Sequence, residues 1–241
     1  MKGYVDLHAH WVPGIDDGVK TLDDGLALLS GLRALGFSTC VATPHMRPGM
    51  FDNDAARLRA AYGEIERAHR GRDDLPRIAL SSEHWLDDVV FTRLLRGEAL
   101  PYPGSTAALV ELPPEAFPVS LSRCVFELRQ RGLRPVLAHP ERYAPVWSDD
   151  EVLTPLLDAG VVLQLDLCSL VGKYGRRPQK AAEKLLADGA YYLAATDAHR
   201  PHDLAEVGPA IERLHALAGS DEARFLLSDG PSDVLAGTVK T

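Results

Sequence analysis

The chain has 241 residues, of which 46% are hydrophobic and 25% are charged, the composition of an ordinary globular protein. Its formal net charge of −8 argues against a general nucleic-acid-binding protein, because nucleic acids favour basic surfaces. No apolar run approaches the roughly 20 residues that cross a bilayer, and no signal-peptide segment precedes the first predicted strand. We therefore expect a cytoplasmic protein without direct membrane insertion.

Seven short apolar segments, rich in Val, Leu, Ala or aromatic residues, have the length of β-strands. They cover residues 4–8, 38–43, 77–82, 107–112, 134–138, 161–167 and 191–196. Helical patterns lie between and after them, at residues 22–35, 53–70, 119–131, 149–159, 178–188 and 204–218. Several of these helices end at a glycine that leads directly into the next strand, which is typical of a repeating β-α-β chain.

Parallel strands joined by crossover helices form either an open sheet or a barrel. The carboxyl ends of barrel strands converge on one face, whereas an open sheet spreads them along an edge. Because side chains able to bind metals follow nearly every predicted strand, we expect an α/β fold of TIM-barrel type with seven strands. No linker, internal repeat or low-complexity stretch indicates a second domain, so we expect one domain over residues 1–241.

The first strand ends in Asp6-Leu7-His8-Ala9-His10. Residues i and i+2 of a strand point to the same side, so His8 and His10 direct two imidazoles into one space. Two unrelated polar residues at a strand end would give the same pattern, but comparable residues also follow the later strands. The complete candidate set of metal ligands comprises His8, His10, Asp17, His45, Glu83, Glu111, His139, Asp197 and His199.

Five histidines and four carboxylates suit Mn, Fe or Zn better than Ca or Mg, because imidazole favours transition metals. Nine ligands exceed the needs of one tetrahedral or octahedral ion, which indicates two or three ions with bridging carboxylates. With three divalent ions, the filled centre would be positive by roughly two charges. Such a centre favours a phosphate ester as the substrate.

The motifs around these residues resemble those of the PHP (polymerase and histidinol phosphatase) superfamily. Within it, the chain is similar to the manganese-dependent bacterial tyrosine phosphatases of capsule and exopolysaccharide synthesis. The resemblance rests on the segments 6–10 (DLHAH), 13–18 (PGIDDG), 43–45 (TPH), 49–51 (GMF), 138–143 (AHPERY) and 196–199 (TDAH), together with Glu83 and Glu111. DLHAH alone occurs in many metal-dependent hydrolases, whereas PGIDDG followed by TPH and AHPERY is specific.

The resemblance implies a distorted (β/α)7 barrel with the PHP fold and a centre of two to three Mn²⁺ ions, with Fe or Zn as alternatives. It groups His8, His10, Glu83 and Asp197 about one ion, Glu83, Glu111 and His139 about a second, and Asp17, His45 and His199 about a third. The implied reaction is hydrolysis of a phosphate monoester by a water that the ions activate. Arg142, Asp197 and Glu83 are the expected catalytic residues.

Arg142 is placed to bind the phosphate through its planar guanidinium. Arg47 and Arg200 are further candidates for substrate binding. The alternative for Arg142 is an ion pair with Glu141 or with another acid at the barrel rim. Asp166 stands where related chains often have Asn, and an extra carboxylate there could alter substrate fit or metal preference.

Some nearby polar residues have simpler interpretations. His84 follows Glu83 in the same strand and therefore points to the other side, where a structural role is expected. Asp16 is expected to shape its loop, because the resemblance assigns the ligand role to Asp17. The basic segment 172–177 is either a mobile loop over the site or a solvated charge run, and the sequence leaves both open.

Cys40, Cys124 and Cys168 are widely spaced, which favours reduced and mostly buried thiols over a disulfide framework. None of them begins a Cys-x5-Arg motif, and the chain has neither a Gly-x-Ser-x-Gly elbow nor a Walker phosphate loop. Cysteine, serine and P-loop chemistry are thereby excluded.

Three functions remain. The first is a protein-tyrosine phosphatase acting on a phosphotyrosine protein, a membrane-associated bacterial tyrosine kinase by resemblance. The second is a phosphatase for histidinol phosphate or another small molecule, and the third is a non-catalytic metal-binding scaffold. PGIDDG and AHPERY favour the first, and the complete ligand set argues against the third. The sequence gives no indication of the oligomeric state.

Overall fold

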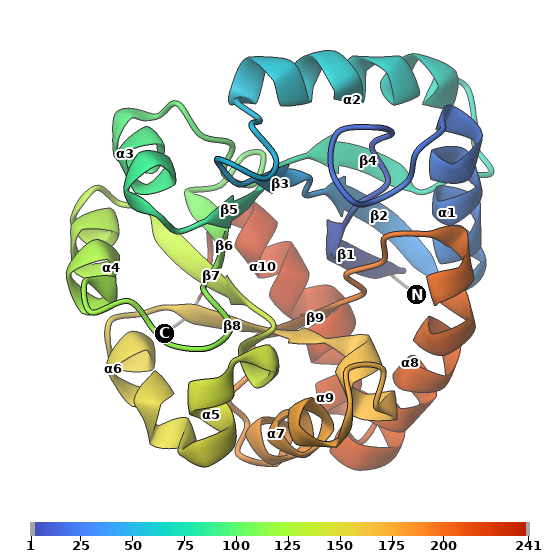
Figure 1. The fold of residues 1–241 in the computed structure, drawn as a ribbon. Coiled ribbons are helices and arrows are strands. Elements are labelled where there is room, and N and C mark those ends of the chain that lie inside the picture. Colours follow the sequence, from blue (N-terminus) through green and yellow to red (C-terminus); the bar gives the residue numbers. More distant parts are fainter. Residues whose placement is uncertain (1–2, 240–241) are drawn as a thin grey trace.

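Parallel strands lie at the centre of the molecule and helices surround them (Figure 1). The computed structural model describes residues 3–239. One sheet has the order β1 (Tyr4–Ala9), β2 (Phe37–Ala42) and β4 (Arg77–Leu80). The other has the order β3 (His45–Met46), β5 (Glu83–Trp85), β6 (Ala107–Glu111), β7 (Arg134–Ala138), β8 (Val162–Asp166) and β9 (Leu193–Ala195). Every neighbouring pair is parallel, which confirms a mixed α/β fold with parallel sheets.

All seven predicted strand segments contain a strand, but two of these strands are interrupted near their carboxyl ends. Pro44 separates β2 from β3, because proline has no N–H for the ladder. Ser82 separates β4 from β5, and its hydroxyl donates a hydrogen bond to the Pro44 carbonyl at 2.8 Å. Beyond these breaks, His45 pairs with Glu83 in the second sheet. The interruptions thus bring two predicted metal ligands side by side.

The two sheets also meet where β1 and β9 end. Ala9 and Ala198 form an isolated parallel bridge. The His10 amide donates to the Ala198 carbonyl at 2.9 Å, and the Asp197 amide donates to the His8 carbonyl at 2.8 Å. These bonds hold the first and last ligand-bearing segments of the chain together, although they are about 190 residues apart in sequence.

The helices lie around the strands. Their bounds are α1 (Leu22–Ala34), α2 (Ala55–His69), α3 (Asp88–Arg96), α4 (Leu121–Gln130), α5 (Ala144–Ser148), α6 (Thr154–Asp158), α7 (Arg176–Ala187), α8 (Leu204–Ala218), α9 (Ser220–Arg224) and α10 (Gly230–Ala236). Short 3-10 helices cover Pro140–Arg142, Asp150–Leu153, Leu167–Val171 and Pro201–Asp203, and a π-helix covers Phe225–Asp229. No helix within residues 3–239 is long and apolar enough to cross a membrane.

Most predicted helices are confirmed to within a few residues, whereas α3, α5, α9 and α10 were not predicted. The segment 149–159, predicted as one helix, is helical but divided: a 3-10 helix over Asp150–Leu153 leads directly into α6, in which Pro155 lacks the N–H needed to continue an α-helix from the preceding turn. Helix α3 was not predicted, although Asp87 caps its start by accepting from the Val90 amide at 2.8 Å. Gly97 ends α3 with a left-handed φ of 72°.

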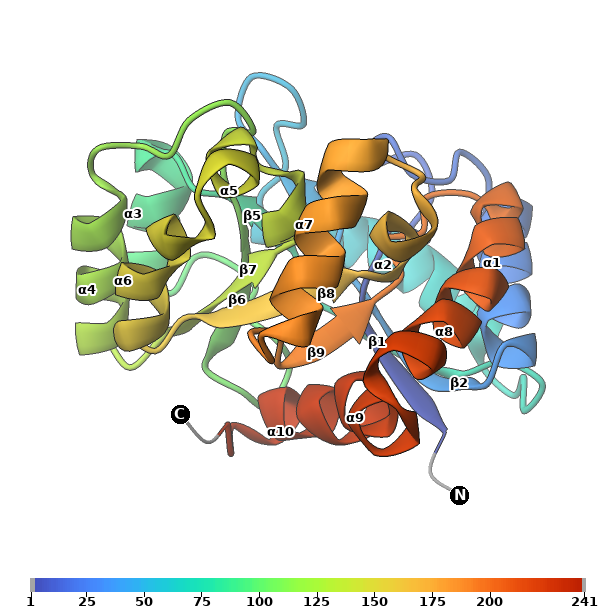
Figure 2. The same ribbon diagram turned by 90° about the horizontal axis from the view of Figure 1, so that it is seen from below.

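One end of the strands is covered by the carboxyl-terminal helices. Figure 2 shows α9 and α10 below the strands, on the same side as the amino end of β1. Val234 of α10 packs with Val5, Leu7 and Leu193 in a buried apolar cluster. The loops that follow the strands therefore lie at the opposite end, where the polar candidates gather.

Candidate metal centre

The predicted ligands converge on the carboxyl ends of the strands. His8 belongs to β1, His45 to β3, Glu83 to β5 and Glu111 to β6. The other five lie on loops that follow strands: His10 and Asp17 after β1, His139 after β7, and Asp197 and His199 after β9. His139 and Asp197 are non-glycine residues with a positive φ, of 36° and 46°. Such strain is stored where surrounding contacts demand it, and functional sites are the usual place.

Four buried side chains form the most compact group of donors: His8, His10, Glu83 and Asp197. Nε2 of His8 lies 3.1 Å from Oε2 of Glu83 and 3.1 Å from Oδ1 of Asp197. Nε2 of His10 lies 3.4 Å and 3.3 Å from the same two oxygens. Two imidazoles and two carboxylates thus surround one small space, which is the set that the resemblance groups about one ion.

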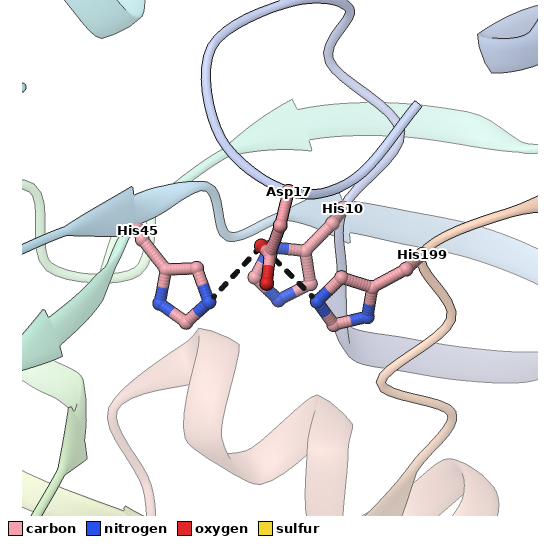
Figure 3. Close-up of side chains that lie close together, drawn as sticks. All are labelled: His10, Asp17, His45 and His199. Carbon is pink, nitrogen blue, oxygen red and sulfur yellow. Dashed lines mark ion pairs between the residues drawn. The ribbon is translucent and has the colours of Figure 1, made fainter. Parts of the chain in front are cut away.

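A second group is more open and comprises His10, Asp17, His45 and His199 (Figure 3). Oδ1 of Asp17 lies 3.5 Å from Nε2 of His45 and 3.5 Å from Nε2 of His199. The rings of His10 and His199 stack with their centres 4.0 Å apart. The resemblance groups three of these residues, and the structure adds His10, which borders both groups.

A third group comprises His45, Glu83 and Glu111. Nδ1 of His45 lies 3.2 Å from Oε2 of Glu83 and 3.8 Å from Oε2 of Glu111. The resemblance places His45 with Asp17 and His199, and places His139 here, where its Nε2 lies 3.1 Å from Oε1 of Glu83. Glu83 is therefore adjacent to four histidines and central to the cluster, as a bridging residue must be.

Partners behind the imidazoles fix how the rings face the cluster. Asp16 Oδ2 lies 2.9 Å from Nδ1 of His10 and accepts from the His45 amide at 3.1 Å. The Gln164 amide lies 2.9 Å from Nδ1 of His8. In each case Nε2 is left to face the donors of the cluster, the usual arrangement for metal-binding histidines. Sequence reasoning missed Gln164, whose only signal is a polar residue inside the apolar strand β8.

Two simpler interpretations agree with these contacts. Asp16 shapes its loop, as expected, by accepting from the Gly18 amide at 2.9 Å, and it also orients His10. His84 is fully buried on the other side of β5, where Nδ1 lies 2.7 Å from the Leu109 carbonyl. These two residues thus have structural roles.

Several buried atoms of the cluster form no hydrogen bond of acceptable geometry among residues 3–239, even where an ionisable atom of a neighbouring side chain lies nearby. They are Nε2 of His10, Nδ1 of His45, Oε2 of Glu111, Nδ1 of His139 and Oδ1 of Asp197. A buried polar atom without a partner is costly, so each of these requires an explanation. A divalent ion with affinity for nitrogen and oxygen would satisfy them, and the residues present fit such an ion.

The electrostatics of the protein alone point the same way. Burial and the neighbouring Glu83 carboxylate raise the pKa of Glu111 to about 8. Burial opposes ionisation of Glu83, but the charges of His8 and His45 outweigh it and hold the pKa of this carboxylate well below its usual range. Burial and the Arg142 charge lower the pKa of His139 to about 4, which leaves a neutral imidazole of the kind that binds metals.

Arg142 lies beside the cluster, in the turn after β7. Its Nη1 donates to Oδ2 of Asp197 at 2.6 Å and lies 3.5 Å from Oδ2 of Asp166. Glu141 is not its partner, because that buried side chain accepts from the Asp166 amide, the Ser169 hydroxyl and the Tyr191 hydroxyl, each at 2.9 Å. The predicted alternative of a pair with an acid thus applies to Asp197 and Asp166, while Glu141 anchors the turn.

A cavity of about 250 Å³ opens next to the cluster. It is lined by Asp17, Arg142, Lys173, Tyr174, Asp197, His199, Arg200, His202 and Asp203. Two larger cavities, of about 960 and 510 Å³, contain none of the nine candidate ligands. The small cavity is therefore the one that a substrate reaching the cluster would use.

Only two of the three candidate arginines line the small cavity. Arg142 and Arg200 both line the small cavity. Arg47 lies instead with its guanidinium carbon 3.6 Å from the ring centre of Trp85, and does not line that cavity. The basic segment 172–177 borders the cavity through Lys173 and Tyr174, whereas its two arginines are exposed.

Comparison with known proteins gives sequence relatives over most of the chain. The family model "Capsular polysaccharide synthesis, CpsB/CapC" matches residues 4–236. Tyrosine-protein phosphatase YwqE of Bacillus subtilis is 26% identical over 196 residues, which cover 81% of this chain and 77% of that relative. Tyrosine-protein phosphatase CpsB of Streptococcus pneumoniae is 25% identical over 241 residues, which cover 96% and 98% of the two chains.

Solved structures share the fold. A structure from a study of YwqE from Bacillus subtilis and CpsB from Streptococcus pneumoniae, described as metal-dependent tyrosine phosphatases, matches with a TM-score of 0.89 and 24% identity. The match covers 98% of this chain and 96% of that chain. A mutant organophosphorus hydrolase from Deinococcus radiodurans matches with a TM-score of 0.57 and 14% identity, over 98% and 93% of the two chains. Because the family model spans nearly every described residue, the chain belongs to the CpsB/CapC family of capsular polysaccharide synthesis.

Proposed function

We propose that this protein is a metal-dependent phosphomonoester hydrolase that removes phosphate from tyrosine in proteins. The observation that carries the proposal is the cluster of buried donors, with unpartnered nitrogen and oxygen atoms, directly beside Arg142 and a small cavity. The names of the relatives, tyrosine-protein phosphatases in both cases, support the same activity. Membership of the CpsB/CapC family supports a role in capsule or exopolysaccharide synthesis.

The proposed metal ligands are the nine residues predicted from the sequence. His8, His10, Glu83 and Asp197 would hold one ion, and Glu83 would link it to an ion beside Glu111 and His139. Asp17, His45 and His199 would hold a third ion at the more open side. We propose two to three Mn²⁺ ions, with Fe or Zn as alternatives, because the donors mix imidazole nitrogen with carboxylate oxygen.

Ions held by these residues would supply a bound water of lowered pKa and positive charge for the phosphate oxygens. Arg142 binds the nonbridging phosphate oxygens and stabilises the charge that develops on them in the transition state. Arg200, which lines the same cavity, would add a second positive charge, and Arg47 is the third candidate. Glu83 and Asp197 would contribute by holding the ions, and Asp197 accepts a hydrogen bond from Arg142.

The remaining expectations belong to the same proposal. We infer one domain over residues 1–241 and a distorted (β/α)7 barrel, supported by the bonds between the ends of β1 and β9. We propose a cytoplasmic location and a phosphotyrosine protein as partner, a membrane-associated bacterial tyrosine kinase. A protein substrate agrees with a centre that is bordered by a cavity of only about 250 Å³, which takes the phosphorylated side chain and leaves the rest of the substrate outside.

A substrate panel tests the proposal. Purified protein with added Mn²⁺ is compared on phosphotyrosine peptides, histidinol phosphate and nucleotides, with chelator-treated protein as the control. We expect the highest kcat/KM on phosphotyrosine peptides and no turnover after chelation. Preference for histidinol phosphate would support a small-molecule phosphatase instead, and metal binding without turnover of any substrate would support a scaffold.

A further inference from the structure

We propose that Tyr174 is a positioning residue that holds the guanidinium of Arg142 over the metal centre. The inference rests on the proposed function in one respect, the role of Arg142 in binding phosphate. Tyr174 lies in the segment 172–177, which the family motifs do not include. Its contacts assign it a role that follows from the geometry around Arg142.

Arg142 is held in place through one nitrogen atom. Nη1 contacts both Asp197 and Asp166, at 2.6 and 3.5 Å. Both carboxylates thus act on the same end of the guanidinium, which leaves Nε and Nη2 for the nonbridging oxygens of a phosphate. The contact with Asp166 is long, so the two contacts at Nη1 restrain the plane of the guanidinium only weakly, and a contact to its face would orient the fork further.

Tyr174 supplies that third contact. The guanidinium carbon of Arg142 lies 4.3 Å from the centre of the Tyr174 ring, over its face. A flat guanidinium on an aromatic face is attracted by the ring quadrupole and is restrained to its plane. The side chain of Arg142 is only 29% exposed, and an interaction of this kind is stronger where water is partly excluded.

The backbone around Tyr174 is itself anchored. Gly172 and Gly175 have φ values of 83° and 95°, which other residues rarely adopt, so the two glycines enclose a tight turn. Lys173 places its Nζ 2.9 Å from Oδ1 of Asp203, and its amide donates to the Cys168 carbonyl at 3.2 Å. The ring of Tyr174 is therefore presented to Arg142 by a fixed turn.

Tyr174 is electrostatically coupled to Asp166, the second carboxylate beside Arg142. Burial and the Asp166 charge raise the pKa of Tyr174, so its hydroxyl stays protonated. Arg142, Asp166 and Tyr174 thus form a connected group at the rim of the cavity. A phosphate that enters the cavity meets an arginine whose orientation is already set, which lowers the entropic cost of binding.

The experiment is a double-mutant cycle on Mn²⁺-loaded full-length protein. Tyr174→Leu and Tyr174→Phe are made in wild-type and Arg142→Ala backgrounds. Binding of inorganic phosphate is measured by calorimetry, and kcat/KM is measured on an aryl and an alkyl phosphate. Tyr4→Leu is the matched control, because Tyr4 packs on Phe37 at the opposite end of β1.

We expect Tyr174→Leu to weaken phosphate binding and kcat/KM by about tenfold, equally on both substrates, with metal content unchanged. Tyr174→Phe keeps the ring and should stay within about threefold of wild type. In the Arg142→Ala background, Tyr174→Leu should have no further effect beyond about twofold, because its partner is gone.

Three results would overturn the inference. Phosphate affinity unchanged by Tyr174→Leu would exclude any role for the ring. An undiminished loss in the Arg142→Ala background would mean that Tyr174 acts without Arg142. A loss on the aryl phosphate alone would mean that the ring contacts the substrate directly. If wild-type protein hydrolyses neither substrate, the proposed function is wrong, while the phosphate-binding cycle still decides the role of Tyr174.

Discussion

At the scale of single residues, the two oxygens of Asp197 face different partners. Oδ1 lies 3.1 Å from Nε2 of His8, inside the donor cluster. Oδ2 accepts from Nη1 of Arg142 at 2.6 Å. One carboxylate therefore contacts both the proposed metal site and the proposed phosphate-binding arginine.

The first prediction concerns Arg142. Arg142→Ala should lower kcat/KM on a phosphotyrosine peptide by roughly 100- to 1000-fold, because a charged contact to the transition state is typically worth about 2.7–4 kcal/mol. Arg142→Lys should recover only part of this loss, since an ammonium keeps the charge but lacks the planar fork. Metal content and melting temperature serve as controls and should stay near wild type. Near-normal kcat/KM in Arg142→Ala would shift the role to Arg200 or Arg47.

The second prediction concerns Asp166, whose carboxylate is fully buried 3.5 Å from Nη1 of Arg142. Burial and the Asp197 charge raise its pKa to about 6, so at pH 7.5 it is mostly ionised and repels an anionic substrate. Asp166→Asn should lower KM for phosphotyrosine peptides by about two- to fivefold with little change in kcat. An increase in KM would mean that the carboxylate helps more by holding Arg142 than it harms by repulsion.

At the scale of elements, the candidate site lies at the carboxyl ends of the strands, whereas α10 packs at their opposite end. Glu141 ties the turn bearing Arg142 to the end of β8 by accepting from the Asp166 amide at 2.9 Å. At the other end, α10 packs against β9, and a Cβ atom at Gly230, the first residue of α10, would lie too close to the backbone carbonyl oxygen of Tyr192. A methyl group at position 230 would collide with that carbonyl, which cannot move without disturbing β9.

The third prediction follows from this contact. Gly230→Ala should destabilise the protein by about 1–3 kcal/mol, which lowers the melting temperature by roughly 2–12 °C in a chain of this size. Gly63→Ala is the matched control, because its neighbour is the flexible end of Arg67 at 3.6 Å within α2. That substitution should be neutral or raise stability by about 0.5–1 kcal/mol. The same kcat/KM per folded molecule is expected for both, and an equal effect of the two on melting would contradict the collision.

At the scale of the whole molecule, a chain with a formal charge of −8 gathers several of its acids around one small space. The raised pKa of Glu111, about 8, reflects the loss of solvation on burial and the repulsion by Glu83. Ions that bind the folded protein and not the unfolded chain stabilise it by mass action. Metal removal should therefore affect folding as well as activity.

The fourth prediction is the effect of that removal. Purified protein should contain two to three transition-metal ions per chain by elemental analysis. A chelator should abolish aryl phosphate hydrolysis and lower the melting temperature by about 5–10 °C, the equivalent of about 3 kcal/mol at ion concentrations near 100 Kd. Added Mn²⁺ should restore both. In the variant His8→Ala/His10→Ala, which lacks two donors, the chelator should change the melting temperature much less. Full activity in metal-free protein would contradict the proposed mechanism.

Much of the architecture could be predicted because its signals are local. Apolar runs of strand length, followed by helices that end at glycine, are read from neighbouring residues, and all seven strand segments are confirmed. The spacing of His8 and His10 and the repeated acid or histidine after each strand also indicated a shared site. The sequence by itself therefore determined the order of the seven strand segments and of the longer helices, the parallel α/β class and the candidate donors, since each depends on local periodicity and spacing.

What only the tertiary structure decided depends on contacts between distant segments. The interruptions at Pro44 and Ser82 bring His45 beside Glu83, and their alignment depends on the pairing of two strands nearly 40 residues apart. Gln164 reaches His8 across 156 residues, and Tyr174 covers Arg142 from a turn that follows the 3-10 helix after β8. No local pattern encodes such neighbours, because which side chains meet at the strand ends is set by packing and register over the whole chain.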